Sequence, residues 1–115
     1  MAWHVGLLHP STVLILQNYF AEQVIEDLKE NGKKVIGWDE ILEGGPDTSA
    51  VIMNWRGIKA AVKAVKEHHY VIMSPSGYTY LNFSQTKKED SLTAGGYLPL
   101  EKVYNFEPVP AELDS

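Results

Sequence analysis

The stretch KKVIGWDEILEGG, from Lys33 to Gly45, decides how the fold is predicted. Two lysines lead into a short apolar run, and an indole and two carboxylates follow it at Trp38, Asp39 and Glu40. A buried parallel strand has this pattern when it delivers polar groups to a site at its carboxyl end. The glycines at 44–45 then end the segment, because glycine readily takes the left-handed backbone of a tight turn.

The segments around this stretch continue an alternation of helices and strands. Apolar residues recur every three or four positions over 12–31 and 57–67, which predicts two amphipathic helices. The runs 34–38, 49–55 and 70–74 are continuously apolar, which predicts three parallel strands that are buried on both faces. This order of elements predicts an α/β fold.

The remaining segments are less regular. Residues 39–48 are expected to form a loop with at most one helical turn, and 75–77 a turn that precedes an extended aromatic segment at 78–83. An additional strand is expected at 3–8, and the proline-bearing tail at 106–115 is expected to be extended.

Composition limits the classes of protein. The chain has 115 residues, of which 44% are hydrophobic and 22% charged, and it has no cysteine. These values predict one soluble domain without disulfides or thiol chemistry. The net charge of -5 argues against nucleic acid as a partner, and no apolar run is long enough to cross a membrane. The N-terminus does not resemble a secretory signal, so the localisation stays open.

Polar and aromatic side chains follow each of the three expected strands. They are Trp38 and Glu40 after the first strand, Trp55 and Arg56 after the second, and Tyr80 and Asn82 after the third. Aromatic walls with a few hydrogen-bonding groups suit a sugar, whose C–H faces stack on indole while its hydroxyls need donors and acceptors. The alternative is that both tryptophans are ordinary core residues. No metal or cofactor is expected, because His68-His69 lacks a third ligand and no phosphate-binding loop is present.

The adjacent carboxylates Asp39 and Glu40 suggest the catalytic pair of a glycosidase. Adjacent residues on an extended strand point to opposite faces, so they do not easily flank one glycosidic bond at a separation of about 5 Å or more. We therefore expect that one of them caps or orients the following turn instead.

Four motifs stand in order along the chain. They are GKKVIGWDEILEGG at 32–45, VIMNWRG at 51–57, YVIMSPSGYTYLNF at 70–83 and GGYLPLEKVYNFEPVP at 95–110. Together they resemble the family 20 glycoside hydrolases, the β-N-acetylhexosaminidases. The resemblance covers 17–110, with an unlike segment at 1–16 and a tail at 111–115. It implies a partial (β/α)8 TIM barrel with roughly strands five to seven, since a whole barrel takes about 250 residues.

The resemblance also implies roles for the residues at the strand ends. Trp38 and Trp55 would be walls of a pocket for the sugar's 2-acetamido group, whose oxygen attacks the anomeric carbon in this substrate-assisted mechanism. Tyr80 would donate its hydroxyl to that oxygen. Asn82 stands where the family usually has a sugar-binding Asp. Glu40 matches a family acid near the pocket, and Arg56 follows the second tryptophan as in relatives; neither receives a firm role.

The family's His-x-Gly-Gly-Asp-Glu motif, which supplies the general acid, does not occur in these residues. The resemblance therefore implies a β-N-acetylhexosaminidase fragment that is inactive alone. One alternative is a non-catalytic carbohydrate-binding or assembly module. Another is an intact flavodoxin-like domain, although the phosphate-binding turn of that fold is missing. Unpaired sheet edges predict a homodimer or higher oligomer. Family members are often secreted, periplasmic or lysosomal, which leaves the compartment unassigned.

Overall fold

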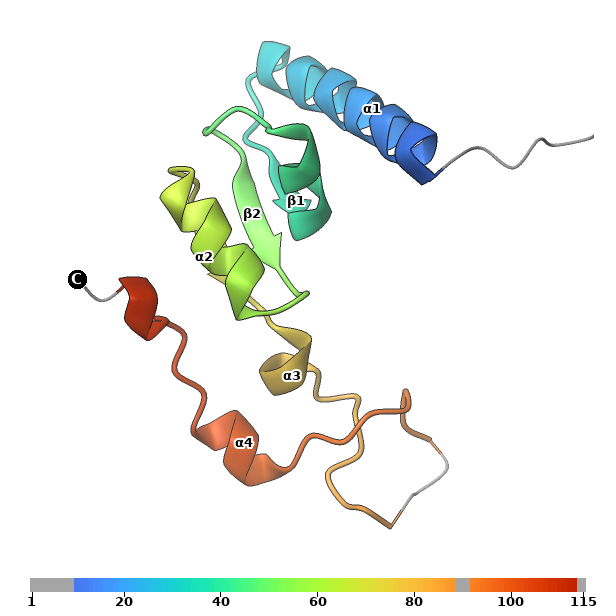
Figure 1. Ribbon diagram of the computed structural model, residues 1–115, viewed down its shortest axis with the longest axis vertical. Coiled ribbons are helices and arrows are strands. Elements are labelled where there is room, and N and C mark those ends of the chain that lie inside the picture. Colours follow the sequence, from blue (N-terminus) through green and yellow to red (C-terminus); the bar gives the residue numbers. More distant parts are fainter. Residues whose placement is uncertain (1–9, 89–91, 114–115) are drawn as a thin grey trace, which may run out of the picture.

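Three parallel strands with flanking helices make up the fold (Figure 1). The computed structural model describes residues 10–88 and 92–113, so the strand expected at 3–8 lies outside the described residues. The elements are α1 (Pro10–Glu30), β1 (Ile36–Trp38), the 3₁₀ helix η1 (Asp39–Gly44), β2 (Val51–Asn54), α2 (Ile58–Lys66), β3 (Val71–Met73), α3 (Ser76–Thr79), α4 (Leu100–Tyr104) and the 3₁₀ helix η2 (Ala111–Leu113). The predicted α/β class is confirmed.

The sheet has the strand order β1-β2-β3, with both pairs parallel. In this register Trp38 lies beside Met53, and Asn54 beside Met73. The three strands therefore end at one edge of the sheet, and the residues that follow them start from neighbouring positions. This arrangement is the one that the apolar strand pattern predicted.

One face of the sheet is covered and the other is open. Ile52 is fully buried and packs with Leu42 of η1 and Ala64 of α2, which lies along this face (Figure 1). On β1, by contrast, Ile36 is 58% exposed and Trp38 is 53% exposed. The expected burial on both faces is therefore wrong for the described chain, because none of its elements packs over these two side chains.

Helix α1 begins at Pro10, two residues before the predicted start. Proline is well tolerated in a first helical turn, where its missing N–H would have no partner in any case. The helix ends as predicted at Gly32, whose φ of 68° lets the Gly32 and Lys33 amides bond back to the last turn. Residue 16 lies inside this continuous helix. Among the described residues, no helix is both long and apolar enough to cross a membrane.

The aromatic segment after β3 differs from its prediction. Tyr78 belongs to the short helix α3, which Pro75 precedes with a φ of -65°, and the chain turns again at 81–82. The amides of Tyr78 and Thr79 both donate to the Pro75 carbonyl oxygen. This local bonding outweighs the preference of aromatic residues for extended strands. The tail is likewise not extended throughout, since it contains η2.

Helix α2 ends in a Schellman motif with a histidine in the position that glycine prefers. His68 has a φ of 67°, while its amide bonds to the Val65 oxygen and the His69 amide bonds to the Ala64 oxygen. We expect His68→Gly to raise the free energy of unfolding by about 0.5–1 kcal/mol, because glycine avoids the left-handed penalty. Urea denaturation measures this. Gly32→Ala, at the same position of α1, should lose stability; a loss in His68→Gly would contradict the prediction.

Candidate functional site

An open depression lies where the strands end. It has a volume of about 730 Å³ and is lined by Gln17, Gly37, Trp38, Glu40, Ile41, Trp55 and Tyr80. Four of the residues expected at the site, namely Trp38, Glu40, Trp55 and Tyr80, therefore lie together although they follow three different strands. The parallel register explains this, because it brings the carboxyl ends of the strands to one edge.

The sequence did not indicate the other three lining residues. Gln17 comes from α1, and only the packing of that helix against η1 brings it to the depression. Gly37 does carry a structural signal: a Cβ atom there would lie 2.6 Å from Cδ1 of Ile41. Glycine at this position thus makes room for Ile41, which also lines the depression.

Glu40 is bonded to one of the two tryptophans. Its carboxylate oxygens accept the indole Nε1–H of Trp55 at 2.9 and 3.1 Å. Glu40 is in the first turn of η1, directly after β1, while Trp55 directly follows β2. The two side chains therefore join neighbouring strand ends inside the depression.

Asp39 is fully buried and does not line the depression. Its Oδ2 accepts hydrogen bonds from Asn54 Nδ2 at 2.6 Å and from the backbone amides of Trp55 and Arg56, each at 3.1 Å. Its Oδ1 accepts from Arg56 Nε at 2.7 Å. Asp39 thus joins the start of η1 to the segment between β2 and α2. The two adjacent carboxylates point to different partners, as the strand geometry predicted.

The Arg56 guanidinium lies over η1 instead of lining the depression. It bonds to the Asp39 carbonyl oxygen at 2.8 Å and contacts Glu43 at 3.4 Å. Its burial would lower its pKa, but the hydrogen bond and the charge of Asp39, together with Glu40 and Glu43, more than offset this and raise the pKa of Arg56. Arg56 is therefore a permanent cation that is held by acids of η1.

Tyr80 and Asn82 are separated by the turn that follows α3. The Tyr80 ring lines the depression and meets Phe83 edge-on, with ring centroids 5.5 Å apart. Asn82 is exposed, does not line the depression, and accepts a bond from the Ala94 amide through its backbone oxygen. The structure thus brings Tyr80 but not Asn82 to the two tryptophans.

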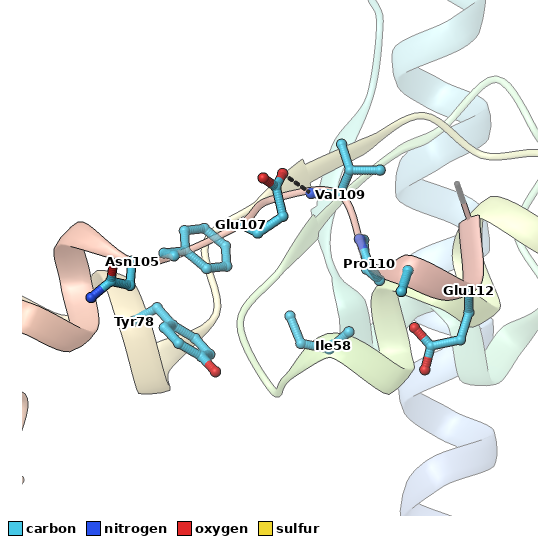
Figure 2. A pocket seen from close by; sticks show the side chains of 9 residues that line it. Ile58, Tyr78, Asn105, Glu107, Val109, Pro110 and Glu112 are labelled. Atoms are coloured by element: carbon cyan, nitrogen blue, oxygen red, sulfur yellow. Dashed lines mark hydrogen bonds between the residues drawn. The ribbon is translucent and has the colours of Figure 1, made fainter. Parts of the chain in front are cut away.

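A second depression of about 670 Å³ lies between the start of α2, α3 and the C-terminal segment (Figure 2). Tyr78 stacks on Phe106 there at a centroid distance of 4.9 Å, and Glu107 accepts the Val109 amide. None of its lining residues lines the depression at the strand ends. We assign it no function, because its Glu107 carboxylate already closes a local turn.

The histidine pair at the end of α2 has a structural explanation. His69 is buried, and its Nδ1 lies 2.9 Å from the Ala50 carbonyl oxygen, which can only accept, so Nδ1–H is the donor. This bond joins the end of α2 to the start of β2. Within residues 10–88 and 92–113, no cluster of three or more His, Cys, Asp or Glu could hold a metal ion.

Comparison with known proteins gives consistent results. The model of "Glycosyl hydrolase family 20, catalytic domain" matches residues 8–115. The chain is similar to a β-hexosaminidase of Porphyromonas gingivalis, with 47% identity over 85% of this chain and 13% of that protein. It is also similar to a β-hexosaminidase of Vibrio furnissii, with 31% identity over 82% of this chain and 16% of the other.

A solved structure gives the same result for the fold. It is the family 20 exo-β-N-acetylglucosaminidase from Vibrio harveyi in complex with N-acetylglucosamine, which matches with a TM-score of 0.70 and 33% identity over 84% of this chain and 16% of that chain. The chain thus spans less than a fifth of the proteins that it matches, and its three parallel strands are part of a TIM barrel. On these grounds the chain belongs to glycoside hydrolase family 20.

Proposed function

We propose that the chain supplies part of the acetamide pocket of a β-N-acetylhexosaminidase and does not hydrolyse glycans alone. One observation carries this proposal: Trp38, Trp55 and Tyr80, which follow three different strands, line a single depression. The relatives named β-hexosaminidase support the reaction class. The substrate class is a glycan that ends in N-acetylhexosamine.

The side chains fit the parts of an acetamide site. The two indoles give flat apolar surface for the acetamide methyl and the sugar face. Within the described parts of the chain, the Tyr80 hydroxyl makes no hydrogen bond, so it can donate to the acetamide oxygen. Asn82 remains a proposed ligand of sugar hydroxyls. As a neutral amide it forms a bond about half as strong as that of a carboxylate.

The lack of activity follows from a missing proton source. When the acetamide oxygen bonds to the anomeric carbon, the bond to the leaving oxygen breaks, and that oxygen must receive a proton. Glu40 is the one carboxyl group among the described residues that line the depression. Both of its oxygens accept the Trp55 indole N–H, so it acts as an acceptor and not as an acid.

A titration with N-acetylglucosamine tests the proposed pocket. We expect the indole ¹H–¹⁵N signals of Trp38 and Trp55 to shift with N-acetylglucosamine, while glucose, which lacks the acetamide, leaves them in place. Trp38→Phe and Trp55→Phe assign the signals. Equal responses to both sugars, or none, would count against an acetamide pocket. Turnover of a chromogenic N-acetylglucosaminide above background would contradict the proposed inactivity.

The exposed apolar side chains of α1 favour a second candidate, an assembly module that oligomerises. We call these residues the α1 apolar surface; their exposed fractions lie between 37% and 70%, and they are Val13, Leu14, Ile15, Leu16, Tyr19, Phe20, Val24 and Leu28. The strands β1 and β3 also form the two edges of the sheet. Such surfaces and edges recruit partners. An in-frame His-x-Gly-Gly-Asp-Glu motif upstream in the coding DNA would favour the enzyme-fragment candidate instead.

A further inference from the structure

We propose that Asp39 and Glu40 form a two-point clamp on Trp55, in which Glu40 is the positioning residue that fixes the indole plane. Asp39 holds the backbone of Trp55, and Glu40 holds the tip of its side chain. The clamp itself is independent of any ligand, whereas its effect on sugar binding rests on the proposed function. It gives the adjacent carboxylates a role other than that of a catalytic pair.

The backbone end of the clamp is rigid. Asp39 is fully buried, and its Oδ2 accepts the Trp55 amide at 3.1 Å and the Arg56 amide at 3.1 Å. The same oxygen accepts from the fully buried Asn54. Consecutive donors on one oxygen fix the direction in which the chain leaves β2. The Cα–Cβ bond of Trp55 therefore starts from a defined position and orientation.

The side-chain end is held by the single donor of the indole. Nε1–H is the sole hydrogen-bonding group of a tryptophan side chain, and it lies 2.9 and 3.1 Å from the two oxygens of Glu40. A bond to a carboxylate is about twice as strong as a neutral one. A tryptophan side chain rotates about only two bonds, so holding the backbone and Nε1 together determines the plane of the ring.

The other tryptophan of the depression is not held in this way. Trp38 is 53% exposed, and in the described part of the chain its indole makes no hydrogen bond. Trp55 is therefore the fixed wall of the depression and Trp38 the adjustable one. A wall that is fixed before binding reduces the ordering cost when a ligand stacks on it.

The clamp is tested first without any sugar, by the indole signal of Trp55 in ¹⁵N-labelled protein. We expect Glu40→Ala to move this signal upfield and to speed its exchange with water roughly tenfold, as loss of a charge-assisted bond implies. Glu40→Gln should lie between wild type and Glu40→Ala, because its amide oxygen still accepts. It also keeps the test usable if Glu40→Ala fails to fold.

The matched control is Glu43→Ala, which removes an exposed carboxylate of the same helix η1 that contacts Arg56 and not the indole. It should leave the Trp55 signal unchanged, and the Trp38 signal should stay in place in all variants. A Trp55 signal that is equal in wild type and Glu40→Ala, or that Glu43→Ala moves equally, would overturn the clamp.

The sugar titration separates the clamp from the proposed function. If wild type binds N-acetylglucosamine, Glu40→Ala should weaken binding roughly tenfold. Equal affinities would overturn the positioning role while the pocket stands. If wild type binds no sugar but the Trp55 signal depends on Glu40, the clamp stands and the proposed function fails.

Discussion

Replacing Asp39 with alanine is expected to lower the free energy of unfolding by about 3 kcal/mol. The change removes the acceptor of Asn54 Nδ2, of two backbone amides and of Arg56 Nε. Breaking a buried ion pair costs about 3–5 kcal/mol, because the remaining charge loses its partner in a site that water reaches poorly. We expect the lower end of that range, since Arg56 is 36% exposed and water screens part of its charge.

Urea denaturation followed by circular dichroism measures the loss. Asp47→Ala is the matched control, because Asp47 is an exposed acid whose 3.2 Å ion pair with Lys29 lies at the surface. Exposed pairs contribute little, so its unfolding midpoint should stay close to that of wild type. Asp39→Asn should lose nearly as much as Asp39→Ala, because its amide group cannot accept from the same donors. Equal midpoints for the alanine variants of Asp39 and Asp47 would contradict the prediction.

The purified chain is expected to form a dimer or larger assembly, and the double variant F20E/I36K to be a monomer at the same concentration. Phe20 is 70% exposed on the α1 apolar surface, and Ile36 is 58% exposed on the edge strand β1. A charge at each position opposes burial of that surface and pairing of that edge. Because both side chains are exposed, neither substitution removes core packing.

Size-exclusion chromatography with light scattering measures the mass. Tyr104→Glu is the control, since Tyr104 is 87% exposed on α4 and belongs to neither feature. This variant should keep the mass of wild type. A monomeric wild-type chain would rule out the assembly candidate, and equal effects of F20E/I36K and Tyr104→Glu would point to unspecific association.

Much of the fold could be predicted because it depends on local patterns. Continuous apolar runs marked the three strands, and the glycine at 32 marked the end of α1. The segment 78–83 was wrong, because a proline-initiated turn outweighed aromatic strand preference there. Burial on both faces was also wrong, since an apolar pattern shows which side chains favour burial but not whether the described elements cover them.

The candidate site divides in the same way. Strand ends in a parallel sheet meet at one edge, so the grouping of Trp38, Trp55 and Tyr80 could be expected from the sequence. Gln17 could not, because its place depends on how α1 packs against η1. The bond between Glu40 and Trp55 joins residues 15 positions apart and depends on side-chain directions that no spacing rule gives.

By itself the sequence determined the α/β class, the family and the strand ends at which the aromatic residues gather. These follow from periodicity and chain order, which act over a few residues. Only the tertiary structure decided that Asp39 turns inward and Glu40 toward Trp55. Both carboxylates are free of steric preference in the sequence, and their directions were set by where the N–H donors of Trp55 and Arg56 came to lie.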